Sequence, residues 1–363
     1  MSLNLTASSP SQALKIIEAC YHLEETVMLH GNPGIGKSEL IAYFAREVIR
    51  GECLIAMLPQ LDAPDIRGLP SLNDEEKMTE WYRPEFLPTK PGPGVVFLDE
   101  INGAEPRIQK AAYQLLLNRS VGRYQLPKGW LIAAAGNMGS DGAVIYQMDT
   151  PAANRMVHIQ LMADPEEWIQ WAMKHAIASE VISFIRSRPD MLDGNKQQVD
   201  GELLLGPTPR GWARLSRFIT DTQLDRRSVE LVACGILGQA TAASFMAVFD
   251  EVRRYATVDA LLKNKGEKRM KMYPKSLAGM YNLAYGLTAY VNKTNWEEII
   301  GVALDIEKLD GQYKQIGLAE VVTLTMELLL TKLNEIGVGH LVPKNARYQQ
   351  YAERRTAIGL ASR

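Results

Sequence analysis

The chain has 363 residues, of which 46% are hydrophobic and 23% charged, and its formal net charge is −2. These values are ordinary for a globular protein with a large core, and they exclude a global positive field that would draw the chain to nucleic acid or to an anionic membrane. No apolar run approaches the roughly 20 residues of a membrane-spanning helix.

The start of the chain and its cysteines bear on its location. Residues 1–20 lack the charged and apolar regions of a signal peptide. Cys20, Cys53 and Cys234 are odd in number and far apart, which fits neither a metal site nor a disulfide framework. We expect three small buried thiols in a reducing compartment, and hence a cytoplasmic protein.

Short apolar runs alternate with helical patterns up to residue 162, which predicts a parallel sheet with crossover helices. Four of these runs lack apolar–polar alternation, as expected of strands that are buried on both faces. The four predicted strands lie at residues 26–30, 54–57, 95–98 and 130–135. Helices are predicted at residues 37–49 and 106–118.

Beyond residue 162 the strand pattern stops, and the apolar spacing predicts helices. These helices cover residues 165–178, 180–187, 209–220, 228–240 and 319–334, and a polar loop is predicted at 188–201. The last 20 residues are polar and are expected to fray.

The segment VMLHGNPGIGKSELIAYF carries a phosphate-binding pattern between a predicted strand and a predicted helix. Its glycines let the backbone turn so that several N–H groups point at one anion, a lysine reaches the outer phosphates, and a serine hydroxyl ligates Mg²⁺. The alternative is a glycine turn before an ordinary helix, but the flanking strand and helix favour the phosphate site. We expect ATP to be bound by Gly31, Asn32, Pro33, Gly34, Ile35, Gly36, Lys37, Ser38 and Glu39.

Polar residues follow two further predicted strands. Asp99 and Glu100 come directly after the strand at 95–98, and Asn137 follows the strand at 130–135. Because the carboxyl ends of parallel strands form the ligand-binding edge of such sheets, Asp99 is expected to hold Mg²⁺ together with Ser38. Glu100 is expected to deprotonate the attacking water, and Asn137 to lie beside the γ-phosphate. The alternatives are two solvated acids and an asparagine in a turn.

These patterns predict an α/β fold with three domains. Residues 1–162 are expected to form the αβα sandwich of a P-loop NTPase with a parallel sheet. Residues 163–244 are expected to form an all-α lid, and residues 245–363 a C-terminal helical extension.

The motifs Gly31–Ser38, VVFLDEIN (95–102) and AAAGN (133–137), in this order and spacing, resemble those of AAA+ ATPases. The DEIN sequence and the segment LDAPDIRGLP (61–70) are similar to the MoxR branch of that family. The resemblance is dense over residues 10–220 and becomes sparse beyond them.

The resemblance implies roles for three residues. Asn137 falls on the family's sensor-1 position, Arg155 on the arginine finger that reaches a neighbouring subunit's nucleotide, and Arg210 on the sensor-2 position of the lid. The usual phenylalanine after the finger is Met156 here. From the residues alone, Arg155 could instead cap a helix, and Arg210 could be an arginine near a helix start.

The resemblance also implies an assembly and a partner. We expect a homo-hexameric ring that acts as a chaperone-type remodelling machine on a client protein, with a partner that carries a von Willebrand factor A domain. Between the second strand and the Asp99 strand, the branch carries a hairpin that faces the central pore. Trp81 and Tyr82 would grip a client there, unless they pack the hairpin onto the sheet.

Two other functions compete with the remodelling ATPase. A nucleic-acid-stimulated AAA+ motor would use the basic stretch at residues 263–275, in which Tyr273 is the only aromatic residue. The simpler interpretation of that stretch is a solvated loop. We expect no membrane partner. The third function is a nucleotide-gated binding module with low turnover, which the presence of Glu100 disfavours.

Overall fold

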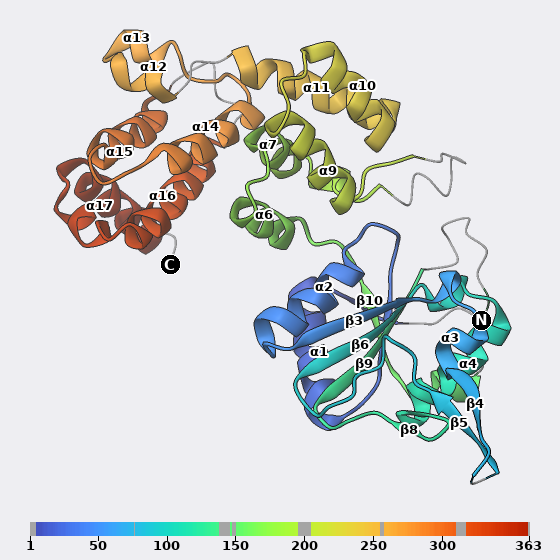
Figure 1. Ribbon diagram of the computed structural model, residues 1–363. Helices are drawn as coiled ribbons and strands as arrows, with labels where there is room; N and C mark the ends of the chain where they lie inside the picture. Colours follow the sequence, from blue (N-terminus) through green and yellow to red (C-terminus); the bar gives the residue numbers. More distant parts are fainter. Residues whose placement is uncertain are drawn as a thin grey trace. The chain divides into compact units, whose positions relative to one another are not determined.

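The computed structural model describes residues 5–75, 77–137, 146, 150–194, 205–254, 258–309 and 317–361. The chain divides into two compact units, which are described separately (Figure 1). Unit 1 comprises Met1–Trp168 and Leu192–Gly211, and unit 2 comprises Ile169–Met191 and Trp212–Arg363.

Unit 1 is built on a six-stranded sheet in which every strand pair is parallel. The strands follow the order β1 (Ala7–Ser8), β10 (Val157–Leu161), β2 (Val27–His30), β9 (Trp130–Gly136), β6 (Gly94–Asp99) and β3 (Glu52–Met57). The last residue of β2, His30, is in register with Gly136 at the end of β9. The residues that follow β2, β9 and β6 therefore lie together at the carboxyl ends of the strands.

Each face of this sheet has its own hydrophobic core. Val95 and Phe97 of β6 face one core, which also contains residues of α1 (Pro10–Leu23) and α2 (Lys37–Tyr43). Val96 and Leu98 face the other, shared with α3 (Ala63–Arg67) and α4 (Pro106–Asn118). The two pairs of helices cover opposite faces of the sheet (Figure 1). This arrangement confirms the αβα sandwich.

The predicted strands correspond to β2, β3, β6 and β9, but β3 differs from the other three in burial. β2, β6 and β9 are buried throughout, whereas β3 lies at the sheet edge and leaves Ile55 48% exposed. The expectation of burial on both faces was therefore wrong for β3. β10 was missed because its sequence VHIQL alternates polar and apolar residues.

The predicted helix at 37–49 is present, but it changes from an α-helix to a π-helix along its length. α2 ends at Tyr43, and Phe44–Val48 continue as a π-helix.

Among the cysteines, Cys20 is buried as expected, whereas Cys53 and Cys234 are only partly buried, and all three are free thiols. Burial raises the pKa of Cys20 and Cys53.

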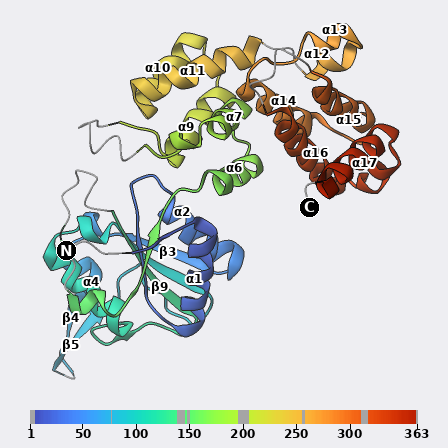
Figure 2. The same cartoon turned by 180° about the vertical axis from the view of Figure 1, so that it is seen from behind.

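Two antiparallel hairpins are added to this unit. The strands β4 (Leu69–Asn73) and β5 (Met78–Tyr82) pair with Leu69 opposite Tyr82, and the hairpin extends away from the sheet (Figure 2). The second hairpin joins β7 (Ser120–Val121) to β8 (Tyr124–Gln125). A short helix, α5 (Thr150–Ala153), precedes β10.

Unit 2 is helical over its described residues. Phe184, Trp212, Phe245 and Phe249 form an aromatic core with ring centroids 5.1 to 5.7 Å apart. The helices entering or lying in this unit are α6 (Pro165–Lys174), α7 (Ser179–Ser187), α9 (Pro209–Thr220), α10 (Arg226–Leu237), α11 (Gln239–Arg254), α12 (Val258–Lys263), α13 (Glu267–Met270), α14 (Leu277–Tyr290), α15 (Trp296–Asp305), α16 (Leu318–Glu335) and α17 (Ala346–Ala361).

The predicted domain boundary at 244/245 falls within α11 and stays a prediction, as does the boundary at 162/163. Most of the polar end of the chain forms α17, in which Arg354 bonds to Glu307 at 2.8 Å, and the expected fraying stays a prediction. Residues 195–201 of the predicted loop lie outside the described residues. None of the described helices is both long and apolar enough to cross a membrane.

Candidate functional site

The glycine loop lies between β2 and α2, and two of its glycines have backbones that other residues rarely adopt. Gly36 has φ +105° and Gly34 has φ +77°. A Cβ on Gly34 would also lie 2.9 Å from the hydroxyl oxygen of Thr208. The loop conformation therefore requires glycine at these positions, in agreement with the phosphate-binding pattern.

Lys37 connects this loop to the end of β9. Its side chain is buried, and its Nζ donates hydrogen bonds to the carbonyl oxygens of Gly31 (2.6 Å) and Asn32 (3.1 Å). Nζ also donates to Oδ1 of Asn137 at 2.9 Å. The fold thus brings together the predicted phosphate lysine and the predicted sensor asparagine, which are 100 positions apart in the sequence.

Ser38 and Asp99 lie together at the end of β6. The Ser38 hydroxyl donates to Oδ2 of Asp99 at 2.6 Å, and the backbone N–H of Glu100 donates to Oδ1 at 2.9 Å. A hydroxyl and a carboxylate are hard oxygen ligands of the kind Mg²⁺ prefers. This pair therefore fits the predicted metal site.

Glu100 has an unusual backbone for its residue type. Its φ is +56°, in the left-handed region, at a cost of about 1–2 kcal/mol for a residue with a Cβ. The side chain is exposed, and the backbone carbonyl accepts a hydrogen bond from Gly103 as a 3-10 turn begins. This sharp turn directly after the buried Asp99 separates the two acids, one inside and one at the surface.

Asn102 is a functional candidate that the sequence motif contained but that was not singled out. Its Nδ2 donates to the carbonyl oxygen of Asn137, and its Oδ1 accepts from the backbone N–H of Asn137 at 3.0 Å. A Cβ on Gly136 would lie 2.7 Å from this Oδ1, so the preceding glycine makes room for the contact. In the sequence, the asparagine of DEIN and the glycine before Asn137 are the features that could have indicated this contact.

Arg210 lies beside the glycine loop within unit 1. Its backbone N–H donates to the carbonyl oxygen of Gly34 at 3.1 Å, and its guanidinium lies 3.4 Å from Oε1 of Glu39. Thr208 caps the start of α9 by accepting from Gly211 at 3.0 Å. The fold thus brings the predicted sensor-2 arginine to the loop. The ion pair itself is largely exposed and contributes at most about 1 kcal/mol.

Arg155 lies apart from these residues, on the turn between α5 and β10. Its backbone N–H donates to the carbonyl oxygen of Ala152 at 3.2 Å, and its side chain is exposed. Over the described part of the chain, no ion pair or side-chain hydrogen bond is found for Arg155. Among the described residues, Arg155 thus has no hydrogen bond or ion pair with the glycine loop of its own chain.

His30, the residue before the loop, is hydrogen-bonded to a second histidine. Its Nε2 lies 2.7 Å from Nδ1 of His158 on β10. Burial, together with the neighbouring His158 and Lys37, lowers the pKa of His30 to about 4. This imidazole is therefore neutral at physiological pH.

The hairpin of β4 and β5 carries exposed apolar side chains. Trp81 is 49% exposed and Tyr82 is 70% exposed, and Leu69 and Leu72 on the opposite strand are also exposed. Because Leu69 pairs with Tyr82 while Trp81 lies one residue away, both faces of the hairpin carry apolar groups. Neither aromatic side chain is buried against the sheet.

The basic stretch at 263–275 divides into inward and outward residues. Arg269 is buried and lies 3.0 Å from Asp305, and Tyr273 is buried with its hydroxyl donating to the Val302 carbonyl oxygen at 2.8 Å. The tyrosine therefore cannot stack on bases. The exposed cations are Lys263, Lys265, Lys268, Lys271 and Lys275.

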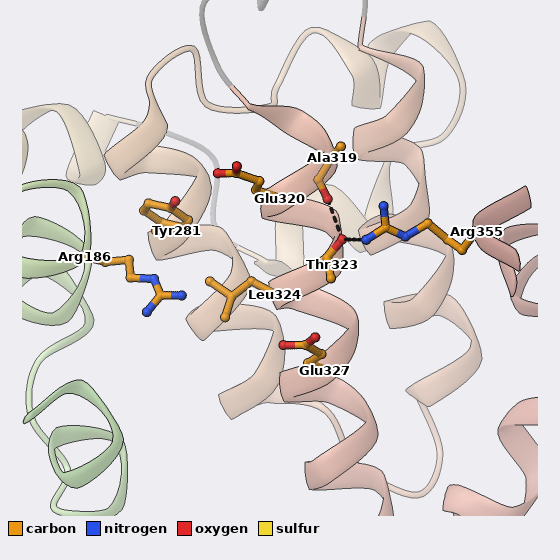
Figure 3. Close-up of a pocket in the computed structure, with 8 residues that line it drawn as sticks. All are labelled: Arg186, Tyr281, Ala319, Glu320, Thr323, Leu324, Glu327 and Arg355. Atoms are coloured by element: carbon orange, nitrogen blue, oxygen red, sulfur yellow. Dashed lines mark hydrogen bonds between the residues drawn. The ribbon is translucent and has the colours of Figure 1, made fainter. Parts of the chain in front are cut away.

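A pocket of about 380 Å³ lies on unit 2, between α7, α14, α16 and α17 (Figure 3). Its lining mixes two guanidinium groups with two carboxylates, so it does not favour a ligand of one charge. None of the predicted site residues belongs to it. The lining residues are Arg186, Tyr281, Ala319, Glu320, Thr323, Leu324, Glu327 and Arg355.

A comparison with protein families gives a match, and the matched residues include the glycine loop and the two strand ends described above. Residues 26–148 match the model of the AAA domain of the dynein-related subfamily. This part of the chain is similar to an AAA domain. The matched segment contains the glycine loop, Asp99, Glu100 and Asn137, and it ends before Arg155 and Arg210. The predicted fold class is confirmed, whereas the match does not reach the level of the MoxR branch.

Solved structures give only distant similarity to this chain. NtrX from Brucella abortus in complex with ATP is 14% identical, with a TM-score of 0.37, over 93% of this chain and 70% of that one. The RuvB Holliday junction branch migration motor from Thermotoga maritima is 15% identical, with a TM-score of 0.34, over 89% and 86%. Similarity at this level does not define a function. No curated protein matches the chain.

Proposed function

We propose that this chain is an ATPase that binds Mg²⁺-ATP at the glycine loop of its AAA domain. The observation that carries the proposal is the meeting of three strand ends at one loop. Lys37 bonds to Asn137 at 2.9 Å, and Ser38 bonds to Asp99 at 2.6 Å. These are the charges and ligands that phosphoryl transfer needs, and each comes from a different segment of the chain.

Each residue of the site has a distinct task in this proposal. Backbone N–H groups of the loop bind the phosphates, and Lys37 moves from its carbonyl partners to the outer phosphate oxygens. Ser38 and Asp99 would hold Mg²⁺, which would supply positive charge to the phosphate oxygens. Glu100 takes the proton of the attacking water. Asn137 donates to the water or to the γ-phosphate, and Asn102 keeps it in place.

The two arginines supply positive charge from different sides. Arg210 lies beside Gly34 and is proposed to act on the nucleotide of its own subunit. Arg155 is exposed and is proposed to act on the nucleotide of the next subunit, as part of a homo-hexameric ring. A finger supplied by a neighbour can accelerate phosphoryl transfer by roughly 10³–10⁵-fold.

The work done with ATP is proposed to be the remodelling of a partner protein. The basis is the resemblance of residues 61–70 and of DEIN to the MoxR branch, which also suggests a partner with a von Willebrand factor A domain. The exposed Trp81 and Tyr82 support a client-gripping role for the hairpin. Aromatic side chains are favoured in protein contacts because they bury much apolar area with few rotamers.

The shared site is tested by measuring ATP hydrolysis per subunit against protein concentration. We expect the wild type's specific activity to rise with concentration and reach a plateau, because assembly completes the site. Arg155→Ala should stay low at all concentrations, and Glu100→Gln should bind ATP without hydrolysing it. Concentration-independent activity together with a fully active Arg155→Ala variant would refute the ring mechanism. Wild-type turnover in Glu100→Gln would favour the low-turnover binding module.

A nucleic-acid-stimulated motor is the second candidate, and the five exposed lysines at 263–275 favour it. A lysine surface without an accessible aromatic ring suits sequence-independent phosphate contacts. Stimulation of hydrolysis by DNA, weakened by salt and by exchange of these lysines for glutamine, would support this function. If DNA does not change the rate of ATP hydrolysis at low salt, the nucleic-acid motor is eliminated.

A further inference from the structure

Two histidines connect the strand that leads into the glycine loop with the strand that follows Arg155. His30 is the last residue of β2 and directly precedes Gly31, while His158 is the second residue of β10. Their ring nitrogens are 2.7 Å apart, and the ring planes differ by 18°. The contact joins two adjacent strands of the sheet.

The partners of the two rings fix the direction of the hydrogen bonds. The carbonyl oxygen of Ala153 lies 2.8 Å from Nε2 of His158, and a carbonyl can only accept. Nε2 of His158 therefore carries a hydrogen, and in the tautomer with this single hydrogen the ring accepts at Nδ1. His30 must then donate from Nε2. The chain of hydrogen bonds runs from His30 through His158 to Ala153.

The Ala153 carbonyl is part of the turn that carries Arg155. The same oxygen accepts from the backbone N–H of Met156 at 3.3 Å, and the N–H of Arg155 donates to Ala152 at 3.2 Å. His158 thus binds the backbone on one side of the turn from which the arginine side chain extends. Since the described residues offer the Arg155 guanidinium no ion pair, the position of its backbone decides where the charge is presented.

We propose that His158 is a positioning residue for Arg155, and that His30 links this position to the glycine loop of the same subunit. The inference rests on the proposed function, in which Arg155 completes the neighbouring subunit's site. A shift of the loop strand on nucleotide binding would be passed to the turn by two hydrogen bonds. One subunit's nucleotide would in this way influence hydrolysis in the next.

The test is complementation between variants in mixed assemblies. Glu100→Gln has an intact Arg155 and an inactive site of its own. His158→Phe and His158→Leu keep an intact site and lose both hydrogen bonds. Alone, each apolar variant should lose about 10- to 100-fold in ATP hydrolysis, because small misplacements of a catalytic group have effects of this size. Their affinity for a fluorescent ATP analogue should stay within about twofold of the wild type, well below that loss.

Mixing each apolar variant with Glu100→Gln should restore hydrolysis, because the Glu100→Gln subunit supplies a well-placed arginine to its neighbour. His158→Gln should retain most activity alone, since its amide can accept from His30 and donate to Ala153. His175→Phe is the matched control and should behave as the wild type, because the exposed His175 ring bonds to the Trp171 carbonyl and stacks on the Trp171 ring, a stacking that phenylalanine can keep. All variants are first compared by circular dichroism and thermal unfolding.

The reference is a mixture of Arg155→Ala with Glu100→Gln. Failure of this reference mixture to regain activity would refute the shared site itself. If the reference mixture is active and the His158 mixtures are not, or if the apolar variants alone match the wild type, the positioning role is overturned. It is also overturned if both apolar variants fail to fold while His158→Gln is fully active, which would assign the pair to fold stability.

Discussion

Asn102 holds the backbone of Asn137 on both sides, donating to its carbonyl oxygen and accepting from its N–H group at 3.0 Å. One asparagine side chain thereby fixes the main chain of another, and the second asparagine bonds to Lys37. The ends of β6 and β9 are connected through side chains as well as through the sheet. The position of Asn137 thus depends on a residue that has no direct contact with phosphate in the proposed reaction.

Replacing Asn102 with alanine should impair hydrolysis more than binding. Two partly buried backbone groups lose their partners, which costs about 1–3 kcal/mol of unfolding free energy. We expect hydrolysis to fall about 10- to 100-fold because Asn137 is displaced. Urea unfolding and steady-state kinetics measure the two effects. Asn73→Ala, on the exposed hairpin, is the control, and equal behaviour of the two variants would rule out the positioning role of Asn102.

Alanine at Gly36 should destabilise the chain, whereas alanine at Gly92 should not. Gly36 has φ +105°, so a Cβ there costs at least about 1 kcal/mol even though no atom lies within 4 Å of it. Gly92 has equally open surroundings and an ordinary backbone angle. Thermal unfolding of the two variants separates backbone strain from crowding. A stable Gly36→Ala variant that still binds ATP would contradict the role of this angle.

Loss of the Ser38 hydroxyl should raise the Mg²⁺ requirement. In Ser38→Ala the metal loses one ligand and Asp99 loses its hydrogen-bond partner at 2.6 Å. We expect the Mg²⁺ concentration for half-maximal hydrolysis to rise at least about 10-fold. Ser244→Ala serves as control, since that hydroxyl bonds to the Ala240 carbonyl oxygen in its own helix. An unchanged Mg²⁺ titration would remove Ser38 from the metal site.

Acid should destabilise the chain through His30. Its pKa is lowered to about 4, while an unfolded histidine titrates near 6.5, so between these values the unfolded chain binds more protons. Stability therefore falls as the pH drops from 6.5 towards 4. The expected loss between pH 7 and pH 5 is about 2 kcal/mol. Urea unfolding of His30→Leu should show a correspondingly weaker pH dependence, and an identical dependence would contradict the assignment.

The central sheet could be predicted because its strands are short, uniformly apolar runs. Residues 95–98 and 130–135 are buried on both faces, so no alternation competes with the strand pattern. β10, which lies between β1 and β2, could not be predicted in the same way. The sequence of β10, VHIQL, mixes polar and apolar residues. Its polar residue His158 is accommodated in the sheet by a hydrogen bond with His30.

The candidate site was predictable where one local motif contains the chemistry. The glycine loop and the Asp99–Glu100 pair are such motifs, and their placement in the structure agrees with the expected strand ends. Contacts such as Asn102 with Asn137 depend on the strand order, which puts β9 between β2 and β6. The sequence spacing does not contain this order. The roles of Arg155 and Arg210 stay predictions.

Lys37 has a consequence for the thermodynamics of nucleotide recognition. The residue is only 7% exposed, and its ammonium already donates to oxygen atoms of Gly31, Asn32 and Asn137. Removing this charge from water is thus part of the free energy of folding and not of the free energy of binding. An incoming phosphate exchanges acceptors around a preorganised cation, so binding loses little to dehydration or to side-chain ordering at this position.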